Sequence, residues 1–450
     1  MNDLELAQKL ASLAKKRGAD EAECLVERGR HASVKVRDGV IEDLTQATNK
    51  GAGLRVIVGA RLGFATTTDF DEGGLDMFVA RALAAAKESA PDERNALPTT
   101  KMRGTHPAAA ALGVHWDPAV AEIDPAWKIA AAREMDSAAR AEDPRIRKMD
   151  GASAGESVDA FAIASTRGLA AQHRTTSIWL SCSPVAEADG QLQTSYWMDV
   201  KRSRAALDSP ESVGRKSAQR AARMLGARQV KSCKVPVVFD PQMAASFVGG
   251  LVGAVNGDLA FKKASFLWNQ LNQLVASPLV TLTDDGLRKN GLGTAPFDGE
   301  GVAQRCTPIF ERGVLRNFLY DTTTARKADA HSTGNAARGY ASLPSIGTTN
   351  LTLAAGTTPP AELLRGLKRG FLVTAMLGRG ANTVTGDYSR GANGLWIENG
   401  ECTHAVHEVT VAGSLLQMLA AIDAVGDDLD FRGSTGAPSI RFAELAVSGS

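Results

Sequence analysis

Histidine is the residue type in this sequence that could most directly hold a catalytic metal ion. Seven histidines are spread along the chain: His31, His106, His115, His173, His331, His404 and His407. A helical zinc-protease site needs two histidines four or five residues apart, so that both reach one ion, and a glutamate beside the first as the base. No pair has this spacing. His404 and His407 are three residues apart in a predicted strand, on opposite faces, so we interpret the histidines as exposed or loosely packed.

Two short acidic runs offer a second kind of chemistry. Asp284-Asp285 and Asp298-Gly-Glu300 could act as paired carboxylates in acid–base catalysis or as oxygen ligands of a hard metal ion. Each run is followed directly by glycine, as is common in turns between strands, and we favour that interpretation. No spacing in the chain indicates Ser-His-Asp chemistry.

Two glycine-rich segments could bind a ligand through their main chain. Residues 249–257, GGLVGAVNG, lack the Lys-Ser/Thr and the strand-turn-helix order of a phosphate loop, so that site is not expected. Residues 378–394, GRGANTVTGDYSRGANG, fit a ligand-lining segment as well as irregular strands and hairpins with left-handed glycines. Both interpretations stay open for the second segment.

The elements that would carry these residues begin with a helix and an antiparallel sheet. Leu6, Leu10 and Leu13 approximate helical spacing, and Gly18 is the predicted stop of that helix. Asp38-Gly39 is the signal of a two-residue hairpin, whose central positions need φ > 0. The predicted strands are Ala22–Glu27, His31–Arg37, Val40–Thr48, Gly53–Val58 and Arg61–Thr66, separated by Gly29, Asp38-Gly39, Gly51 and Gly59, and a helix follows at Asp71–Ser89.

The remaining chain predicts a second α+β region and a strand-rich C-terminal region. We predict fold class α+β with three regions: 1–105, helix plus antiparallel sheet; 106–230, a second α+β region that can form one domain with the first; and 231–450, an irregular β-rich domain. The predicted helices are Asp124–Ala141, Ser209–Leu225, Pro241–Leu251, Thr323–Ala328, Pro360–Arg369 and Leu415–Val425, and the strands of the middle region are Ile146–Ser157, Ala160–Thr166, Ala170–Cys182 and Gln191–Arg202.

Composition excludes several classes of partner. Lys+Arg number 51 and Asp+Glu 50, so the formal net charge of +1 gives no field that would attract nucleic acid, and no direct nucleic-acid binding is expected. No run approaches the roughly 18 apolar residues of a membrane helix, so no membrane association is expected. The five cysteines are far apart and form no C-x-x-C pair, which favours reduced thiols in a cytoplasmic protein.

Motifs in the second half of the chain resemble those of one protein family. In order they are TAPFDGEGV, IFERGVLRNFLYDTTTARK, STGNAARGY, LPSIGTTN, GDYSRGANGLWIENGE and VTVAGSLLQML. Together they resemble the TldD/PmbA family over nearly the whole chain, most densely from Pro236 onward. The resemblance implies an N-terminal α+β part, a C-terminal β-rich domain and a cytoplasmic zinc protease built from two subunit types. TldD-type chains carry H-E-x-x-x-H, followed closely by Gly-Asp, and a cysteine ligand near the C-terminus; TldE/PmbA-type chains are their partners.

The metal-ligand positions of the TldD pattern are replaced in this sequence. Counting back from the Gly-Asp at 257–258, the H-E-x-x-x-H positions fall on Val248, Gly249 and Gly253, and the cysteine position falls on Thr435. Valine and glycine cannot bind zinc, and Gly249 cannot act as a base. The resemblance is therefore to the TldE/PmbA-type subunit, with no catalytic residue and no metal in this chain and with zinc in a TldD-type partner.

The resemblance implies the function of a non-catalytic subunit in a heteromeric TldD–TldE metalloprotease. Such a subunit would complete a chamber that admits peptides or unfolded proteins. The family's activities include peptide-antibiotic maturation, antitoxin degradation and an effect on DNA gyrase; the gyrase link has the least support here, since nothing basic suggests DNA contact. We expect chamber or subunit-interface positions at Asp298, Glu300, Asn335, Arg338 and Asp387.

Two alternatives remain open at this point. The first is a self-sufficient hydrolase whose site has moved to Asp284, Asp285, Asp298, Glu300 and His331. The second is a homodimeric scaffold or peptide-binding module that has no protease partner. Zinc content separates the first alternative from the subunit hypothesis, and the presence of an H-E-x-x-x-H relative in the same genome separates the second.

Overall fold

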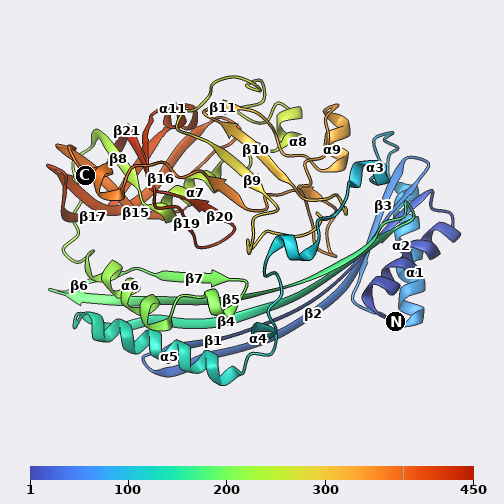
Figure 1. The fold of residues 1–450 in the computed structure, drawn as a ribbon, viewed down its shortest axis with the longest axis horizontal. Coiled ribbons are helices and arrows are strands. Elements are labelled where there is room, and N and C mark those ends of the chain that lie inside the picture. Colours follow the sequence, from blue (N-terminus) through green and yellow to red (C-terminus); the bar gives the residue numbers. More distant parts are fainter. Residues whose placement is uncertain (379) are drawn as a thin grey trace.

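The N-terminal half of the chain forms one long, curved antiparallel sheet (Figure 1). The computed structural model describes residues 1–378 and 380–450. Strands lie in the order β3-β2-β1-β4-β5-β6, and β7 also pairs with β5, so one sheet spans residues 21–201. The strands are β1 Glu21–Arg37, β2 Val40–Val58, β3 Arg61–Thr67, β4 Ile146–Ser165, β5 Ala170–Ala188, β6 Gln191–Thr194 and β7 Trp197–Lys201.

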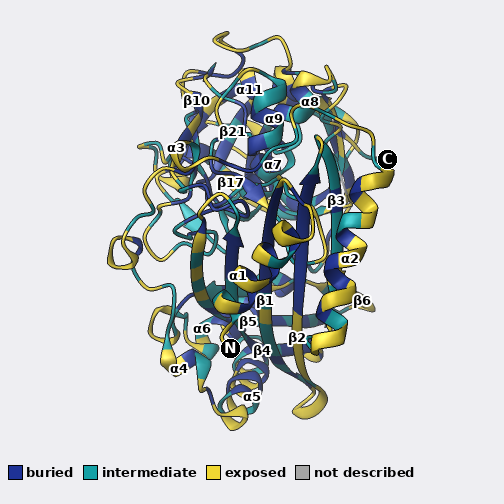
Figure 2. Cartoon of the chain, turned by 90° about the vertical axis from the view of Figure 1, so that its right-hand side faces the viewer, coloured by how far each residue is buried: buried dark blue, intermediate teal, exposed yellow. Residues whose placement is uncertain are grey.

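Four long helices pack against this sheet. α1 (Asp3–Lys16) begins with a capping box between Asn2 and Glu5, which satisfies two main-chain N–H groups. It packs with α2 (Glu72–Glu88) over one end of the sheet, while α5 (Pro125–Glu142) and α6 (Pro210–Ala222) pack over the other. Figure 2 shows exposed outer surfaces on α1 and α2 and buried strands behind them. The connection from α2 to α5 carries the short helices α3 Thr100–Arg103, η1 Ala109–Leu112 and α4 Pro118–Ala121.

Alternation along β1 explains how the two faces of the sheet are used. Cys24 and Val26 pack beneath α1 and α2, and Val34 and Val36 pack beneath α5 and α6. These four side chains share one face because side chains alternate along a strand. Leu25 lies on the opposite face and packs with residues of the C-terminal half, which lies along that side of the sheet.

The predicted strand breaks at Gly29 and Gly51 are wrong, because β1 and β2 run through both residues. A Cβ atom on Gly51 would lie 2.2 Å from the ring of Tyr340, and one on Gly53 would lie 2.3 Å from the Tyr340 carbonyl oxygen. A Cβ on Gly29 would lie 2.2 Å from Oδ1 of Asn49 on the neighbouring strand. These glycines therefore allow close approach of a neighbour within a continuous strand.

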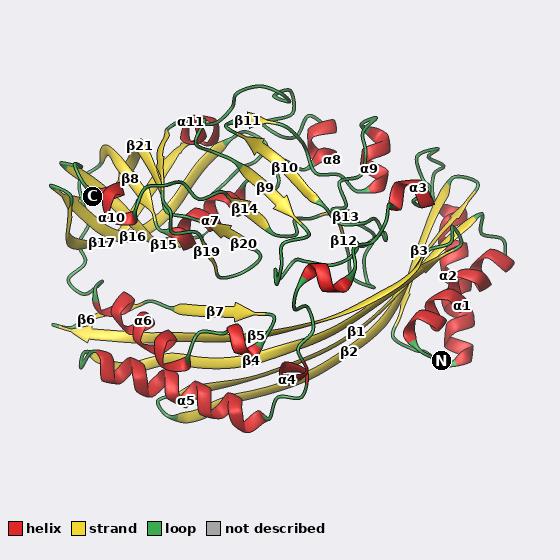
Figure 3. Ribbon diagram, in the orientation of Figure 1, coloured by secondary structure: helices red, strands yellow, loops and turns green. Residues whose placement is uncertain are grey.

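The C-terminal half consists of two six-stranded sheets and a two-stranded sheet of β12 and β13, with short helices and many turns (Figure 3). The sheet orders are β11-β10-β9-β14-β20-β19 and β17-β16-β15-β8-β21-β18, and among the strand pairs of the described residues β14–β20 and β8–β15 are parallel. The α+β fold class with a β-rich C-terminal region is thus confirmed. The strands are β8 Cys233–Phe239, β9 Leu282–Asp285, β10 Cys306–Glu311, β11 Val314–Leu315, β12 Ala336–Ala337, β13 Ser345–Ile346, β14 Leu351–Leu353, β15 Arg369–Leu377, β16 Asp387–Glu398, β17 Glu401–Ser414, β18 Ile422–Val425, β19 Asp430–Phe431, β20 Thr435–Ala437 and β21 Ile440–Ser448, and the helices are α7 Pro241–Gly250, α8 Gly257–Phe261, α9 Thr322–Lys327, α10 Pro360–Leu364 and α11 Leu415–Ala420.

Two predicted helices in this half end earlier than expected. The chain leaves α10 at Gly366, which has φ +81°, and Arg369 then starts β15. Residues after α11 enter β18, which pairs with β21, so Val425 is in a strand. The hairpin predicted at Asp38-Gly39 is confirmed, with φ values of 52° and 78°.

The five cysteines are free thiols. Burial raises the pKa of Cys24 above its ordinary value and that of Cys182 to about 12. Over residues 1–378 and 380–450, no helix has both the length and the apolar character needed to cross a membrane.

Candidate functional site

A pocket of about 440 Å³ lies between α7 and the segment that leads into β20. Asp240 starts α7 by accepting a hydrogen bond from the Met243 N–H at 3.0 Å, and a proline follows it at the first helical position. One side of α7 packs into the core of the C-terminal half and the other faces the pocket. The pocket-lining residues are Pro241, Gln242, Ala245, Ser246 and Gly249 of α7, Asp430, Arg432, Gly433, Ser434 and Thr435, and Tyr196 and Met198 of the N-terminal half.

The structure brings two of the four replaced ligand positions to this pocket. Gly249 and Thr435 both line it. A Cβ atom on Gly249 would meet no atom within 4 Å, so a side chain there would project into open space. Val248 is 3% exposed and belongs to the core, and Gly253 lies beyond the end of α7, where a Cβ would be 2.5 Å from Oγ1 of Thr383.

The residues of this pocket do not fit a zinc ion. Catalytic zinc sites use three protein ligands drawn from histidine, cysteine and carboxylates, and the four replaced positions offer only one hydroxyl group, that of Thr435. The single carboxylate in the pocket, Asp430, accepts a hydrogen bond from Arg432 at 2.7 Å. Within residues 1–378 and 380–450, no group of three or more His, Cys, Asp or Glu side chains could hold a metal ion.

Polar groups of the pocket are suited to holding a ligand by hydrogen bonds. Oε1 of Gln242 is buried and has no hydrogen-bond partner within the described chain. Ser246 accepts a hydrogen bond from Arg390 at 2.7 Å. Arg432 contacts Asp199 at 3.0 Å, which joins the wall of the pocket to β7 of the N-terminal half.

A cluster of buried charges joins the N-terminal sheet to the C-terminal half. Glu23 of β1 contacts Arg55 of β2 at 3.0 Å and Arg338 at 2.6 Å, and Arg55 contacts Glu300 at 2.9 Å. All four side chains are 5% exposed or less. Two carboxylates and two guanidinium groups balance in charge, which offsets the large free-energy cost of burying each ion alone.

Asp298 and Glu300 lie at one end of this charge cluster and have opposite pKa shifts. Asp298 accepts hydrogen bonds from the N–H groups of Glu300, Val302 and Ala336 and contacts no cation of residues 1–378 and 380–450; burial and the Glu300 charge raise its pKa. Burial also raises the pKa of Glu300, but the Arg55 charge and the hydrogen bonds from Thr322 and Arg55 together outweigh burial and hold this pKa below its usual value. Both carboxylates therefore fix turns of the C-terminal half rather than face a substrate.

The other residues of the predicted relocated site do not converge on a reactive centre. Asp284 of β9 is buried and accepts hydrogen bonds from Asn335 at 2.6 Å and from the hydroxyl of Thr349 at 2.9 Å. Asp285 accepts one from the main chain two residues later, and His331 is exposed. This alternative thus lacks a site in the described part of the chain.

The five predicted chamber or interface positions divide into two groups. Asp298, Glu300, Asn335 and Arg338 are buried in polar networks inside the molecule, whereas Asp387 is exposed at the start of β16 and accepts a hydrogen bond from Thr385 at 2.6 Å. Glu23 and Arg55, which pair with members of the first group, were not among the predicted positions. Their signal is a lone charge within an apolar strand, in AECLV and GLRVIV.

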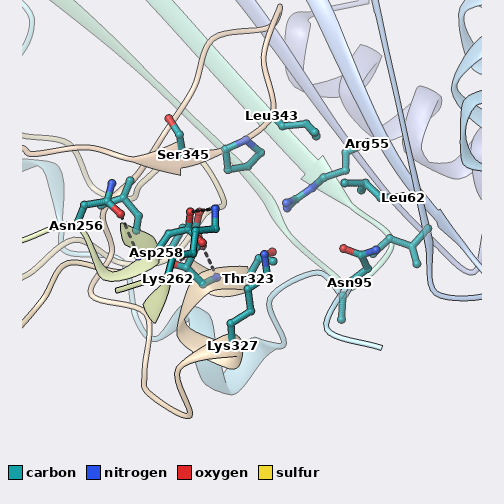
Figure 4. Close-up of a pocket in the computed structure, with 16 residues that line it drawn as sticks. Arg55, Leu62, Asn95, Asn256, Asp258, Lys262, Thr323, Lys327, Leu343 and Ser345 are labelled. Carbon is teal, nitrogen blue, oxygen red and sulfur yellow. Dashed lines mark hydrogen bonds and ion pairs between the residues drawn. The ribbon is translucent and has the colours of Figure 1, made fainter. Parts of the chain in front are cut away.

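A second pocket, of about 280 Å³, lies beside the charge cluster (Figure 4). Arg55 and Leu62 reach it from the N-terminal sheet, and Lys327 reaches it from α9. Lys262 also lines it, but its ammonium group contacts Asp258 at 2.6 Å. The pocket carries both signs of charge and is lined by residues of both halves, so it marks the seam between them.

Sequence models of one family match almost all of this architecture. The PmbA/TldA metallopeptidase domain 1 matches residues 22–86, the central domain matches 118–225 and the C-terminal domain matches 232–449. The chain belongs to the PmbA/TldD metallopeptidase family. The first two matched segments together form the long sheet and its helices, and the third forms the β-rich half.

Relatives named PmbA resemble this PmbA/TldD chain along its full length. It is 30% identical to the metalloprotease PmbA of Escherichia coli O157:H7, covering 96% of this chain and 93% of that protein. The Haemophilus influenzae metalloprotease PmbA homologue is 32% identical over 97% and 94% of the two chains. The TldD homologue of the same organism is 25% identical, with coverages of 96% and 94%. Similarity to the PmbA-named protein is thus greater in an organism that has both.

Solved structures share the fold of this PmbA/TldD-family chain. A Bacteroides thetaiotaomicron protein, whose name proposes it as a modulator of DNA gyrase, has a TM-score of 0.90 at 29% identity, covering 99% of this chain and 98% of that one. TldE from Thermococcus kodakarensis has a TM-score of 0.88 at 22% identity, covering 98% and 99%. The arrangement of long sheet and β-rich half is therefore the fold of the family.

Proposed function

We propose that this chain is the non-catalytic, TldE/PmbA-type subunit of a heteromeric zinc metalloprotease that acts on peptides or unfolded proteins in the cytoplasm. The observation that carries the proposal is the pocket between α7 and β20. Its frame is that of a metallopeptidase family, yet Gly249 and Thr435 line it without supplying zinc ligands or a general base. The zinc and the glutamate would come from a TldD-type partner.

An exposed apolar surface on the C-terminal half supports a partner chain. We call it the 261–279 surface, and its large apolar side chains are 43–64% exposed: Phe261, Trp268, Leu271, Leu274 and Leu279. The Ser277 N–H donates to the Leu419 carbonyl oxygen at 2.9 Å, so the segment lies against α11. Large apolar side chains exposed along one segment are a common feature of protein interaction sites.

A TldD-type relative is the occupant that best suits this surface. Chains of one fold present corresponding surfaces, so two relatives can pair around a pseudo-two-fold axis as identical subunits do around a true one. A subunit without its own catalytic groups can take part in proteolysis only in such an assembly. The proposed substrates are those of the assembly and include peptide-antibiotic precursors and antitoxins; an action on DNA gyrase is not proposed.

Co-expression with a TldD-type chain tests the proposal. We expect the purified chain alone to leave casein and peptides uncleaved, and the co-purified pair to cleave them in a chelator-sensitive way. Replacing the partner's motif glutamate by glutamine should abolish cleavage. Chelator-sensitive cleavage by this chain alone would overturn the proposal and return the self-sufficient hydrolase to consideration.

A matched pair of variants tests the surface. Leu274→Asp places a charge in the 261–279 surface, where the leucine is 64% exposed, and should prevent co-purification. Leu192→Asp makes the same change at a 56% exposed leucine on β6 of the N-terminal half and should leave the pair intact. Equal co-purification of both variants would show that the partner binds elsewhere.

A further inference from the structure

A pocket of about 660 Å³ lies at the edge of the N-terminal sheet and shares no residue with the α7–β20 pocket. Its walls come from residues 170–174 of β5, the adjacent residues 160–162 of β4, the connection at 106–115 and the turn at Pro296-Phe297, and Asp3 of α1 also lines it. The volume falls within the roughly 300–1,000 Å³ that is usual for ligand pockets. The pocket has room for a ligand, and no feature described above accounts for it.

One wall of this pocket is an unpaired stretch of β5. β4 pairs with one side of residues 170–175, but β7 starts to pair with the other side only at Ile178, and no strand of residues 1–378 or 380–450 fills the gap. The Thr176 N–H points to the open side, because it donates to the His115 carbonyl oxygen at 3.0 Å. Main-chain groups alternate along a strand, so the N–H and C=O of Gln172 and Arg174 point to the open side as well.

Aromatic and imidazole rings form the floor of the pocket beside this open edge. The ring centre of Phe297 lies 5.1 Å from that of His173 and 4.9 Å from that of His106, and Phe161 lies 5.3 Å from His173. Nδ1 of His173 is buried and has no hydrogen-bond partner in the described chain. Burial lowers the pKa of His173 to about 4, so this imidazole is neutral near pH 7.

We propose that this edge and pocket bind one strand of an extended peptide, which adds to the sheet beside β5 and places one tyrosine side chain against Phe297 and His173. In strand addition, main-chain hydrogen bonds supply affinity and pockets for alternate side chains supply specificity. A tyrosine offers an aromatic ring for Phe297 and a hydroxyl group for the unpartnered Nδ1 of His173. The proposal rests on the proposed function, because a protease that acts on unfolded chains must hold them extended.

The open edge of β5 and the aromatic pocket together favour a peptide over a small molecule as the ligand. An aromatic small molecule would use the rings but would leave the main-chain groups of Gln172 and Arg174 unpaired. A strand without an aromatic residue would pair with the edge but would leave the pocket unfilled. Only a peptide with both features uses the edge and the pocket together, and the outcomes below separate these three ligands.

Labelled peptides and the full-length chain test the proposal by fluorescence polarisation. The probe is a capped heptapeptide of threonine and serine with one central tyrosine. The first comparison peptide has alanine in place of tyrosine, and the second carries N-methyl groups on the two main-chain amides that flank the tyrosine. We expect saturable binding of the probe and at least about 10-fold weaker binding of each comparison peptide, since each loses more than one favourable contact.

A matched pair of variants at Gln172 tests strand addition from the protein side. Gln172→Pro removes an N–H on the open edge, where proline is tolerated, and Gln172→Ala keeps it. Gln172→Pro should bind the probe about 3- to 10-fold more weakly than Gln172→Ala. His173→Ala should weaken the tyrosine peptide and leave the alanine peptide unchanged. Circular dichroism checks folding, and the N-methylated peptide carries the test if Gln172→Pro does not fold.

Three results would overturn the proposal. They are a lack of saturable binding at millimolar probe, equal binding of the N-methylated peptide, which would indicate an aromatic pocket alone, and equal binding of the alanine peptide, which would indicate an edge without a pocket. The partner assay is separate. An active pair whose subunit binds no probe refutes this inference alone, and probe binding by a subunit whose pair is inactive counts against the proposed function alone.

Discussion

Replacing Arg55 by methionine tests whether the buried charge cluster holds the two halves of the molecule together. Methionine has a similar length but no charge, so Glu300, which is 0% exposed, would lose its cation, whereas Glu23 would keep Arg338. Removing one partner of a buried ion pair costs about 3–5 kcal/mol, because the remaining charge is left without compensation. We expect Arg55→Met to lower the free energy of unfolding by about that amount.

Urea unfolding followed by circular dichroism measures this loss, and hydrogen exchange in β1 and around residue 300 locates it. Arg316→Met is the control, because Arg316 and Glu311 form a pair whose side chains are 42% and 58% exposed, and such pairs contribute about 0–1 kcal/mol. The double variant Arg55→Met/Glu300→Gln removes one charge of each sign and should recover part of the loss. If Arg55→Met costs no more than the control, the cluster does not hold the halves together and the reasoning fails.

Three further predictions concern packing, pH and metal content. Gly53→Ala places a Cβ 2.3 Å from the Tyr340 carbonyl oxygen and should lower the free energy of unfolding, measured by thermal unfolding, by about 1–3 kcal/mol. The control Gly73→Ala in α2, where no atom lies within 4 Å of the added Cβ, should be neutral or stabilising. Equal effects of the two variants would contradict the packing argument. The pKa of His173 is about 4 in the folded chain against 6.5 ordinarily, so the unfolded chain binds the proton more readily. The free energy of unfolding should therefore fall by up to about 3 kcal/mol as the pH drops from 7 to 4. His173→Gln should flatten this pH dependence, and an unchanged dependence would assign it to other groups. Metal analysis of the tag-free chain should find far less than one zinc per chain, and a value near one would refute the absence of a site.

Local signals in the sequence predicted turns well where a residue has one role. Asp38-Gly39 predicted its hairpin because few other pairs accept φ > 0 at both positions. Gly51 misled the strand prediction because glycine also serves where a neighbour comes close. That neighbour is Tyr340, almost 300 residues later, and no local pattern contains it. The lengths of the long strands therefore depended on tertiary contacts that the sequence alone does not display.

The candidate site shows the same division between local and distant information. The replaced positions could be found only through the resemblance to TldD, because valine and glycine carry no chemical signal of their own. Geometry then separated Gly249 and Thr435, which share a pocket, from Val248, which packs in the core. Glu23 and Arg55 could have been suspected as lone charges in apolar strands, but their pairing with Glu300 and Arg338 needed the structure.

The separation of the charge cluster along the chain has a consequence for synthesis on the ribosome. Arg55 and Glu300 are 245 residues apart, which at about 5–20 residues per second means that Arg55 is made roughly 10–50 s before its partner. During that interval the face of the sheet around Leu25 and Ile163 has no cover, since Phe297 is also still to come. The nascent N-terminal half thus presents an apolar, partly charged surface that a chaperone can recognise, and arrival of the C-terminal half ends that exposure.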